Sequence, residues 1–218
     1  MRGHDQLVLP ALMNSDPKLV AALAEQERLR RELHHRVANT LQILASIVSM
    51  LGRDADTQAA RDIHAGIEMH IQAIALVQRW LPDSCPGHPI DAEGLIADLC
   101  ALLQTALSTP DAPKARISYV IPSLALDLDH AMPVALLITA AAIHASMRGQ
   151  SDPLAMAITA SSEAGIVHID IQSVDLGTAA AGSPVPRLVA AMVSQLQGTL
   201  VHDGVGGRWT ISFAATPG

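Results

Sequence analysis

The stretch "RELHHRVANTLQILASIVSML", residues 31–51, decides the fold, because its apolar side chains recur at the spacing of a long amphipathic helix. Ser15, Asp16 and Pro17 form a typical helix start, and nothing between Pro17 and Leu51 breaks the helix. The apolar positions, spaced by 4, 3, 4 and 3 residues, form a coiled-coil seam of Val37, Leu41, Leu44, Val48 and Leu51. We therefore expect one uninterrupted helix ending near Leu51.

A second helix follows a short turn. "GRDADT", residues 52–57, has a glycine stop and offers Asp54, Asp56 or Thr57 as the next helix cap. The helix is expected over 58–80, and its seam consists of Ile63, Ile67, His70 or Ile71, Ile74, Val77 and Leu81. Two helices cannot fully bury their apolar stripes against each other. A second hairpin from another subunit would do so, which predicts a homodimer built on a four-helix bundle.

The rest of the chain mixes helices and strands. The patterns predict helices at 92–108, 129–149 and 186–196, strands at 115–121 and 124–128, and hairpins at 154–174 and 198–214. Such an order is typical of an α+β sandwich. Pro and Gly are frequent in 81–89, which indicates a boundary. We expect an N-terminal extension at 1–16, a helical hairpin at 17–84 and a second domain at 90–218.

The amino-acid composition limits the kinds of partner and the cellular compartment that we expect for this protein. The 218-residue chain has a formal net charge of −7 and no Lys/Arg-rich run, which argues against nucleic acid. The longest apolar candidate, Ala131 to Ala145, is shorter than the roughly 18–20 residues of a membrane span. Asp5 and Pro10 make the start a poor signal peptide. Cys85 and Cys100 lack metal-site or redox spacing, so we expect reduced thiols in a cytoplasmic protein without a membrane partner.

The adjacent histidines His34 and His35 are the main candidates for chemistry. With Val37 and Leu41 on the seam, His34 borders the seam and His35 faces solvent. Adjacent helical side chains point about 100° apart, so the pair cannot chelate one metal ion. An exposed neutral imidazole is a competent nucleophile, although an exposed histidine is more often an ordinary surface residue.

The neighbours of His35 suit phosphoryl chemistry. Asn39 lies four residues after it on the same helix face, and Arg31 lies four residues before it. Arg31 and Arg36 can hold a phosphoryl group, and Asn39 can hydrogen-bond the imidazole or the phosphoryl oxygens. Glu32 completes the set of candidate site residues around this histidine.

A family resemblance points to the role of His35. "ELHHRVANTLQILASIVSM", followed by "ARDIHAGIEMHIQAIALVQRWL", resembles the dimerisation and phosphoacceptor hairpin of the HWE-related, HisKA-type sensor histidine kinases. In that class a histidine followed by Arg, two variable residues and Asn, then Leu-Gln, marks the phosphorylated helix. The resemblance extends over residues 25 to 214. It implies that His35 is the phosphoacceptor and that 90–218 is a Bergerat-type ATP-binding domain.

The ATP site implied by this resemblance is degenerate on its first helix. Family members carry an Asn-Glu-x-x-x-Asn pattern there, which holds magnesium and the nucleotide phosphates. The aligned positions in "AMPVALLITAAAIHA" are Thr139, Ala140 and His144. A hydroxyl, a methyl group and an imidazole do not replace two amides and a carboxylate.

The glycine-rich motifs are degenerate as well. "VDLGTAAAG" keeps Asp175 and Gly177 of an Asp-x-Gly-x-Gly pattern but has Ala179 at the second glycine. The second glycine-rich loop is replaced by "SPVP", residues 183–186, and prolines lack the N–H donors that phosphates need. We interpret Asp175 and Gly177 as turn residues rather than as a retained adenine site, and we expect no cofactor on this chain.

A phosphoacceptor hairpin beside a degenerate ATP-binding domain resembles a ChpT-like histidine phosphotransferase. The resemblance implies that His35 carries a phosphoryl group between aspartates of response-regulator receiver domains, with magnesium held by the receiver. Three alternatives stay open. One is a receiver phosphatase in which Asn39 orients water, another is a dimeric pseudokinase that binds a regulator without chemistry, and the last is residual ATP-dependent autokinase activity.

Overall fold

The computed structural model describes residues 56–80, 89–108, 115–148, 153–177 and 185–215, together with positions 25, 26, 28, 29, 33, 37, 41 and 48. Each of those eight separate positions is helical, as the seam pattern of the first helix predicts. The remaining residues of 1–55, including both histidines of the pair, lie outside the described residues.

Helix α2 spans Gln58–Arg79; it begins where the sequence predicts and ends one residue before the predicted end at Trp80. Thr57 is its N-cap, and the side-chain oxygen of Thr57 accepts a hydrogen bond of 3.2 Å from the backbone N–H of Ala60. This bond satisfies one of the N–H groups that the first turn of a helix leaves without a partner. Of the three caps considered from the sequence, Thr57 is therefore the one used.

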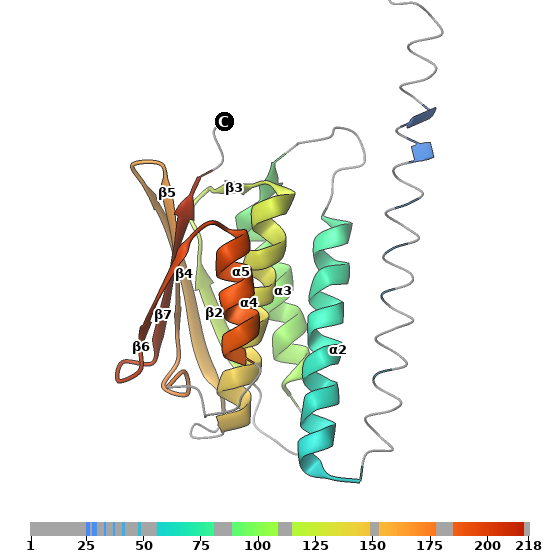
Figure 1. Ribbon diagram of the computed structural model, residues 1–218, viewed down its shortest axis with the longest axis vertical. Helices are drawn as coiled ribbons and strands as arrows, with labels where there is room; N and C mark the ends of the chain where they lie inside the picture. The colour runs from blue at the N-terminus through green and yellow to red at the C-terminus, as the bar shows by residue number, and fades with distance from the viewer. Residues whose placement is uncertain are drawn as a thin grey trace, which may run out of the picture.

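Three helices cover one face of a five-stranded mixed sheet (Figure 1). The helices are α3 (Ala92–Ala106), α4 (Leu128–Arg148) and α5 (Val185–Gln195). The strands are β2 (Arg116–Val120), β4 (Ala155–Glu163), β5 (Ile166–Gln172), β6 (Thr199–Asp203) and β7 (Arg208–Ala214). Their order is β2-β4-β5-β7-β6, with β2 parallel to β4 and every other pair antiparallel. The predicted α+β arrangement of helices beside a mixed sheet is confirmed.

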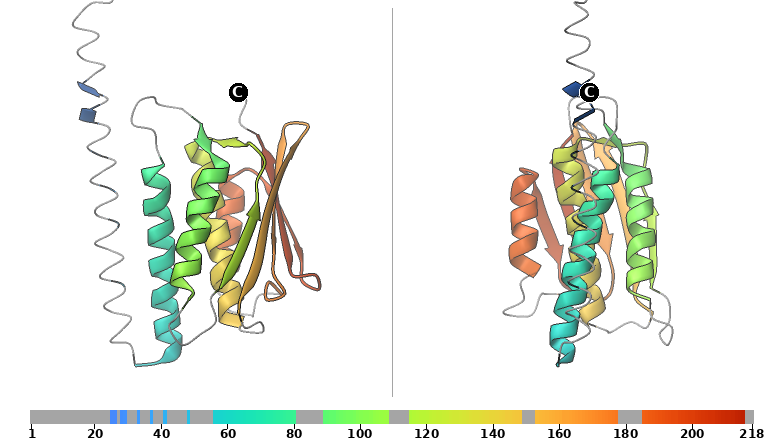
Figure 2. Two further views of the ribbon diagram at one scale, coloured as in Figure 1. Left: turned by 180° about the vertical axis from the view of Figure 1, so that it is seen from behind. Right: turned by 90° about the vertical axis from the view of Figure 1, so that its right-hand side faces the viewer.

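Helix α4 forms the centre of the core. The sheet lies on one side of it and α2 on the other (Figures 1 and 2). Because both sides are covered, the helix is apolar nearly all round, and the largest fully buried side chains include its Leu137 and Ile138. The expectation that no apolar segment reaches the length of a membrane span is wrong for this helix. At 21 residues it is long and apolar enough, but 72% of its most apolar window is buried inside the fold.

Two strand predictions differ in outcome. The hairpin turn predicted at 163–165 is confirmed, since β4 ends at Glu163 and β5 begins at Ile166, with Ala164 and Gly165 at positive φ. The strand predicted over 124–128 is shorter. β3 spans only Ala125–Leu126 and pairs with β1 (Ile90–Asp91), while Leu128 already begins α4. Asp127 ends the strand because its carboxylate accepts the backbone N–H of His130 and so caps the new helix.

Helix α2 has two apolar faces, and the seam predicted from the sequence includes residues of both. One face packs on α3 and α4 and consists of Gly66, Met69, Ala73, Leu76 and Val77, all buried. Val77 was predicted on the seam to the other subunit, yet it is fully buried against this chain's own domain. The other face keeps Ile63 and Ile67 in solvent, with exposed fractions of 57% and 45%.

Candidate functional site

The phosphoacceptor candidates lie outside the described residues. This applies to His34 and His35 and to the neighbouring candidates Glu32, Arg31, Arg36 and Asn39. Two residues that flank the histidine pair in the sequence, Leu33 and Val37, are described; both are helical, with exposed fractions of 61% and 43%. The helical setting of His34 and His35 and the orientation of His35 therefore stay predictions.

The positions that would hold magnesium and phosphates in a kinase face the interior of this protein. Thr139, Ala140 and His144 on α4 have exposed fractions of 0%, 1% and 5%. The hydroxyl of Thr139 donates a hydrogen bond of 2.8 Å to the carbonyl oxygen of Ala135, one turn earlier in the same helix. The Thr139 donor is therefore used within the helix, and Ala140 has no polar side-chain atom to offer.

His144 bridges the helix layer and the loop after β5. Its Nε2 atom lies 3.4 Å from the carbonyl oxygen of Gly177, in a long hydrogen bond in which the imidazole donates. The ring stacks on Trp209 of β7, with centroids 6.0 Å apart and planes inclined by 30°. Burial lowers the pKa of His144 below its usual value, the nearby charges of Arg148 and His202 lower it further, and the bond to Gly177 opposes them. Burial therefore favours the neutral form of this imidazole.

Asp175 and Gly177 belong to a compact turn, residues 173–177, that is anchored to the sheet. The backbone N–H of Ser173 donates to the Gly207 carbonyl at 2.9 Å, and the Leu176 N–H donates to the Ser173 carbonyl at 3.0 Å. The Asp175 N–H donates to the Ser173 hydroxyl at 3.3 Å, and Asp175 has an exposed fraction of 0%. The interpretation of Asp175 as a turn residue fits this geometry.

The outer side of the same turn is covered by two basic side chains. His202 of β6 donates from Nε2 to the Leu176 carbonyl at 3.0 Å, and its ring meets Trp209 edge-on at 6.0 Å. The guanidinium of Arg148 lies against Gly177, where an added Cβ would be 3.1 Å from Nη2. The structure thus brings His144, Asp175 and Gly177 together, as their alignment to one site implies. Sequence reasoning missed Arg148, His202 and Trp209, because no local pattern shows that they lie beside the 173–177 turn and its partner His144.

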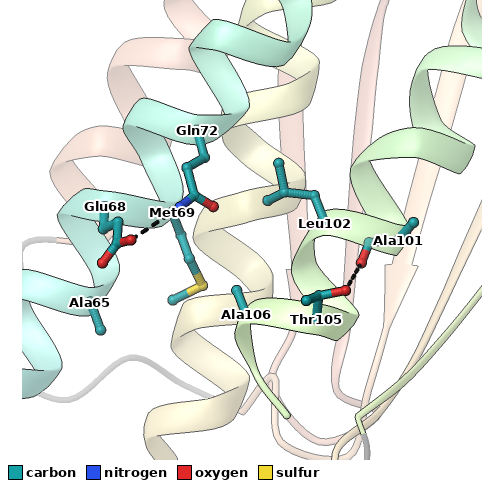
Figure 3. A pocket seen from close by; sticks show the side chains of 8 residues that line it. All are labelled: Ala65, Glu68, Met69, Gln72, Ala101, Leu102, Thr105 and Ala106. Carbon is teal, nitrogen blue, oxygen red and sulfur yellow. Dashed lines mark hydrogen bonds between the residues drawn. The ribbon is translucent and has the colours of Figure 1, made fainter. Parts of the chain in front are cut away.

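A groove between α2 and α3 is a further feature that the sequence did not reveal (Figure 3). It has a volume of about 500 Å³ and is lined by Ala65, Glu68, Met69, Gln72, Ala101, Leu102, Thr105 and Ala106. The Gln72 amide donates to the Glu68 carboxylate at 3.1 Å, and the Thr105 hydroxyl donates to the Ala101 carbonyl at 2.9 Å. These polar groups are satisfied within their own helices. Among the residues that the structure describes, no group of three or more His, Cys, Asp and Glu could hold a metal ion.

Comparison with known proteins relates the chain to histidine kinases. Residues 32–107 match the HisKA_2 family, described as histidine kinase. No curated protein matches the chain. This chain is therefore related to the histidine kinase family through a segment that contains His34, His35 and the second helix of the hairpin.

Solved structures agree on the fold. The histidine kinase domain of the blue-light-activated histidine kinase from Erythrobacter litoralis superposes with a TM-score of 0.59 at 13% identity, covering 88% of this chain and 93% of that chain. A longer structure of the same kinase gives 0.59 at 14% identity, covering 87% of this chain and 63% of that chain. At such identities the likeness concerns the arrangement of helices and sheet, which is that of a histidine kinase domain.

Proposed function

We propose that this protein is a histidine phosphotransferase of a two-component phosphorelay. In the proposed reaction a ring nitrogen of His35 attacks the phosphorus of a receiver aspartyl phosphate, and the aspartate carboxylate leaves. The reverse reaction then charges the aspartate of a second receiver. His35 holds the phosphoryl group between the two steps, beside Arg31, Arg36 and Asn39.

The match of residues 32–107 to the histidine kinase family supports the histidine chemistry, because the "HRVAN" string lies inside that segment. Family members normally dimerise and interact with response regulators. We assign the same partners to this chain. The dimer would bury the apolar side chains that one chain leaves in solvent: Leu29, Leu33, Val37, Ile63 and Ile67, with exposed fractions of 43–61%.

We favour a phosphotransferase over a kinase because Thr139, Ala140 and His144 are buried. Transfer from ATP requires groups that hold magnesium and stabilise charge on the phosphates. In this protein the Thr139 hydroxyl already donates to the Ala135 carbonyl, and the His144 imidazole already donates to the Gly177 carbonyl. We therefore propose that residues 90–218 form a degenerate ATPase-type domain, that the chain binds no cofactor, and that magnesium resides on the receiver. The relay would operate in the cytoplasm.

The decisive experiment incubates the protein with a receiver domain phosphorylated by a small-molecule phosphodonor. We expect an acid-labile, alkali-stable phosphoprotein from the wild type and from His34→Gln, and none from His35→Gln. His34→Gln is a matched control, because it makes the same change at the adjacent position of the sequence. Labelling of His35→Gln equal to that of the wild type would overturn the assignment.

Three further readouts separate the competing activities. Release of inorganic phosphate without a phosphoprotein, abolished in Asn39→Ala, would assign the phosphatase reaction instead. Labelling by ATP and magnesium in the absence of any receiver would assign autokinase activity. Tight receiver binding without transfer in either direction, unchanged in His35→Gln, would assign a non-catalytic pseudokinase.

A further inference from the structure

The groove between α2 and α3 combines an apolar floor with an acidic rim. Figure 3 shows Met69 of α2 and Leu102 of α3 between the two helices, and Met69 is buried with an exposed fraction of 6%. Among the described residues that line the groove, Glu68 is the only charged one. Helix α3 itself carries Glu93 and Asp98 but no Lys, Arg or His. A molecule that fits this groove therefore presents an apolar surface flanked by positive charge.

The polar groups of the lining favour a protein partner over a small polar ligand. The Gln72 amide donates to the Glu68 carboxylate at 3.1 Å. The Thr105 hydroxyl donates to the Ala101 carbonyl at 2.9 Å. Small-molecule sites usually present a few polar groups that converge on the ligand and orient it. Here both donors are used within their own helices, whereas a groove between two helices accepts the apolar side chains of a third helix.

The groove lies on the side of α2 that faces away from the predicted dimer interface. Successive residues of a helix are about 100° apart, which places Gln72 on the opposite side of α2 from Ile63. Gln72 lines the groove, whereas Ile63 and Ile67 belong to the exposed apolar face that we assign to the dimer. A second chain bound to Ile63 and Ile67 would therefore leave the groove open to a different partner.

The position of the groove in the sequence indicates which partner. Every residue that lines it lies within residues 32–107, the segment that matches the histidine kinase family, and members of that family normally interact with response regulators. In the hairpin predicted from the sequence, His35 is as far before the turn at 52–57 as Ile74 is after it. Gln72 is within one helical turn of that level. A receiver domain that reaches His35 would therefore meet the groove as well.

We propose that the groove between α2 and α3 docks the receiver domain. An amphipathic helix of the receiver places apolar side chains between Met69 and Leu102, and a Lys or Arg beside them pairs with Glu68. The proposal rests on the proposed function for the identity of this partner. It makes the receiver contact both the hairpin and the helix that follows it, which gives α3 a role that does not require ATP.

The size of the groove fits a short-lived complex. Stable protein–protein interfaces bury roughly 1,200–2,000 Å² in total, and transient signalling complexes often bury less. A groove of about 500 Å³ holds only a few side chains of one helix. Such a contact suits a carrier that releases one receiver before it binds the next.

Equilibrium binding of fluorescently labelled receiver domains of the source organism to the whole 218-residue chain tests the groove without requiring phosphoryl transfer. Ala101→Trp fills the groove from an exposed position of α3, and Glu68→Lys reverses the charge of its rim. We expect the dissociation constant to rise about tenfold for Ala101→Trp and severalfold for Glu68→Lys. Glu68→Lys should also reduce the salt dependence of binding. Should Ala101→Trp disturb helix packing, Glu68→Lys alone decides the outcome.

Two matched controls make the same changes away from the groove. Ala191→Trp introduces an indole at an exposed position of α5, and Glu163→Lys reverses an exposed charge at the end of β4. Both should bind the receiver as tightly as the wild type does. Equal loss of binding in the controls and the groove variants would contradict a docking site between α2 and α3.

Transfer to His35 is measured on the same samples, so that the two proposals can fail separately. Receiver binding that is unchanged in both groove variants, with transfer intact, would overturn the docking site and leave the phosphotransferase standing. Binding that is weakened in the groove variants, without transfer in the wild type, would overturn the phosphotransferase and support the docking site. A wild type that binds no receiver would overturn both. Dissociation of the dimer by the groove variants, with receiver binding unchanged, would assign the groove to a second copy of this chain instead.

Discussion

The indole of Trp80 packs directly on the backbone of Gly94, at the junction of α2 and α3. A side-chain carbon added at Gly94 would collide with the indole ring. The same indole donates from Nε1 to the Asp98 carboxylate at 3.0 Å. This contact fixes the end of the helical hairpin to the domain that follows. The position requires glycine for close approach rather than for an unusual backbone angle.

Gly94→Ala should destabilise the protein because the new methyl group displaces the Trp80 indole. We expect a loss of about 1–3 kcal/mol in the free energy of unfolding, measured by denaturant titration. Gly66→Ala is the matched control, since a Cβ there would meet Ile143 at an ordinary 3.5 Å. That substitution should stabilise helix α2 by about 0.5–1 kcal/mol. Equal effects of the two changes would contradict the packing assigned to Gly94.

Gly207→Ala should weaken the anchor of the 173–177 turn. Gly207 has a φ of 60°, and a Cβ there would collide with the backbone carbonyl of Ser173. Gly165 has a φ of 78° but nothing within 4 Å, so Gly165→Ala carries only the backbone strain of about 1–2 kcal/mol. We expect Gly207→Ala to lower the unfolding free energy further than Gly165→Ala does. Thermal unfolding of the two variants side by side measures the difference.

Cys100 should be inert in the native protein. It has an exposed fraction of 1%, and burial raises the pKa of its thiol to about 12. At pH 8 the thiolate fraction is on the order of one in ten thousand, so a thiol reagent should react only after unfolding. The measurement uses a Cys85→Ser background, so that any labelling reports on the Cys100 thiol. Rapid labelling of the folded variant would contradict the burial.

The same thiol predicts how stability changes in alkali. The unfolded thiol, with a pKa near 9.0, loses its proton first, so the unfolded state binds fewer protons above that pH. The contribution of Cys100 to stability is present below pH 9 and is lost as the pH rises towards 12. Cys100→Ala should remove this component of the alkaline decline, which denaturant unfolding between about pH 8 and about pH 10 can measure.

Association of two chains should depend on the exposed face of α2. Ile63 and Ile67 have exposed fractions of 57% and 45%, and replacing both with Gln removes apolar area that a four-helix bundle would bury. We expect the dimer dissociation constant to rise by at least about tenfold, as measured by light scattering across a dilution series. Val201→Gln with Val205→Gln makes the same kind of change on exposed valines of the β6–β7 hairpin and should leave association unaltered. A wild-type chain that stays monomeric at high concentration would refute the dimer itself.

The helix caps, helix ends and turns of this protein are determined by residues that are close together in the sequence. The Thr57 cap, the ends of α2, the length of α4 as a core helix and the 163–165 turn follow from short-range rules, and α2 and the turn match closely. The membrane-span expectation was wrong because only the run from Ala131 to Ala145 was counted, whereas the helix that contains this run extends over Leu128–Arg148.

The relation of residues 32–107 to the histidine kinase family was also readable from sequence, because the "HRVAN" string and the seam around it are local patterns. The tertiary structure alone decided three things: which face of α2 packs on α3 and α4, what surrounds His144 and Gly177, and how Trp80 joins α2 to α3. His144, Gly177, His202 and Trp209 are separated by up to 65 positions, and side chains so distant in the chain have no periodicity that ties them together. Their meeting depends on the strand order β5-β7-β6 and on the placement of α4 across the sheet, which arise from burial of the whole core rather than from any local preference.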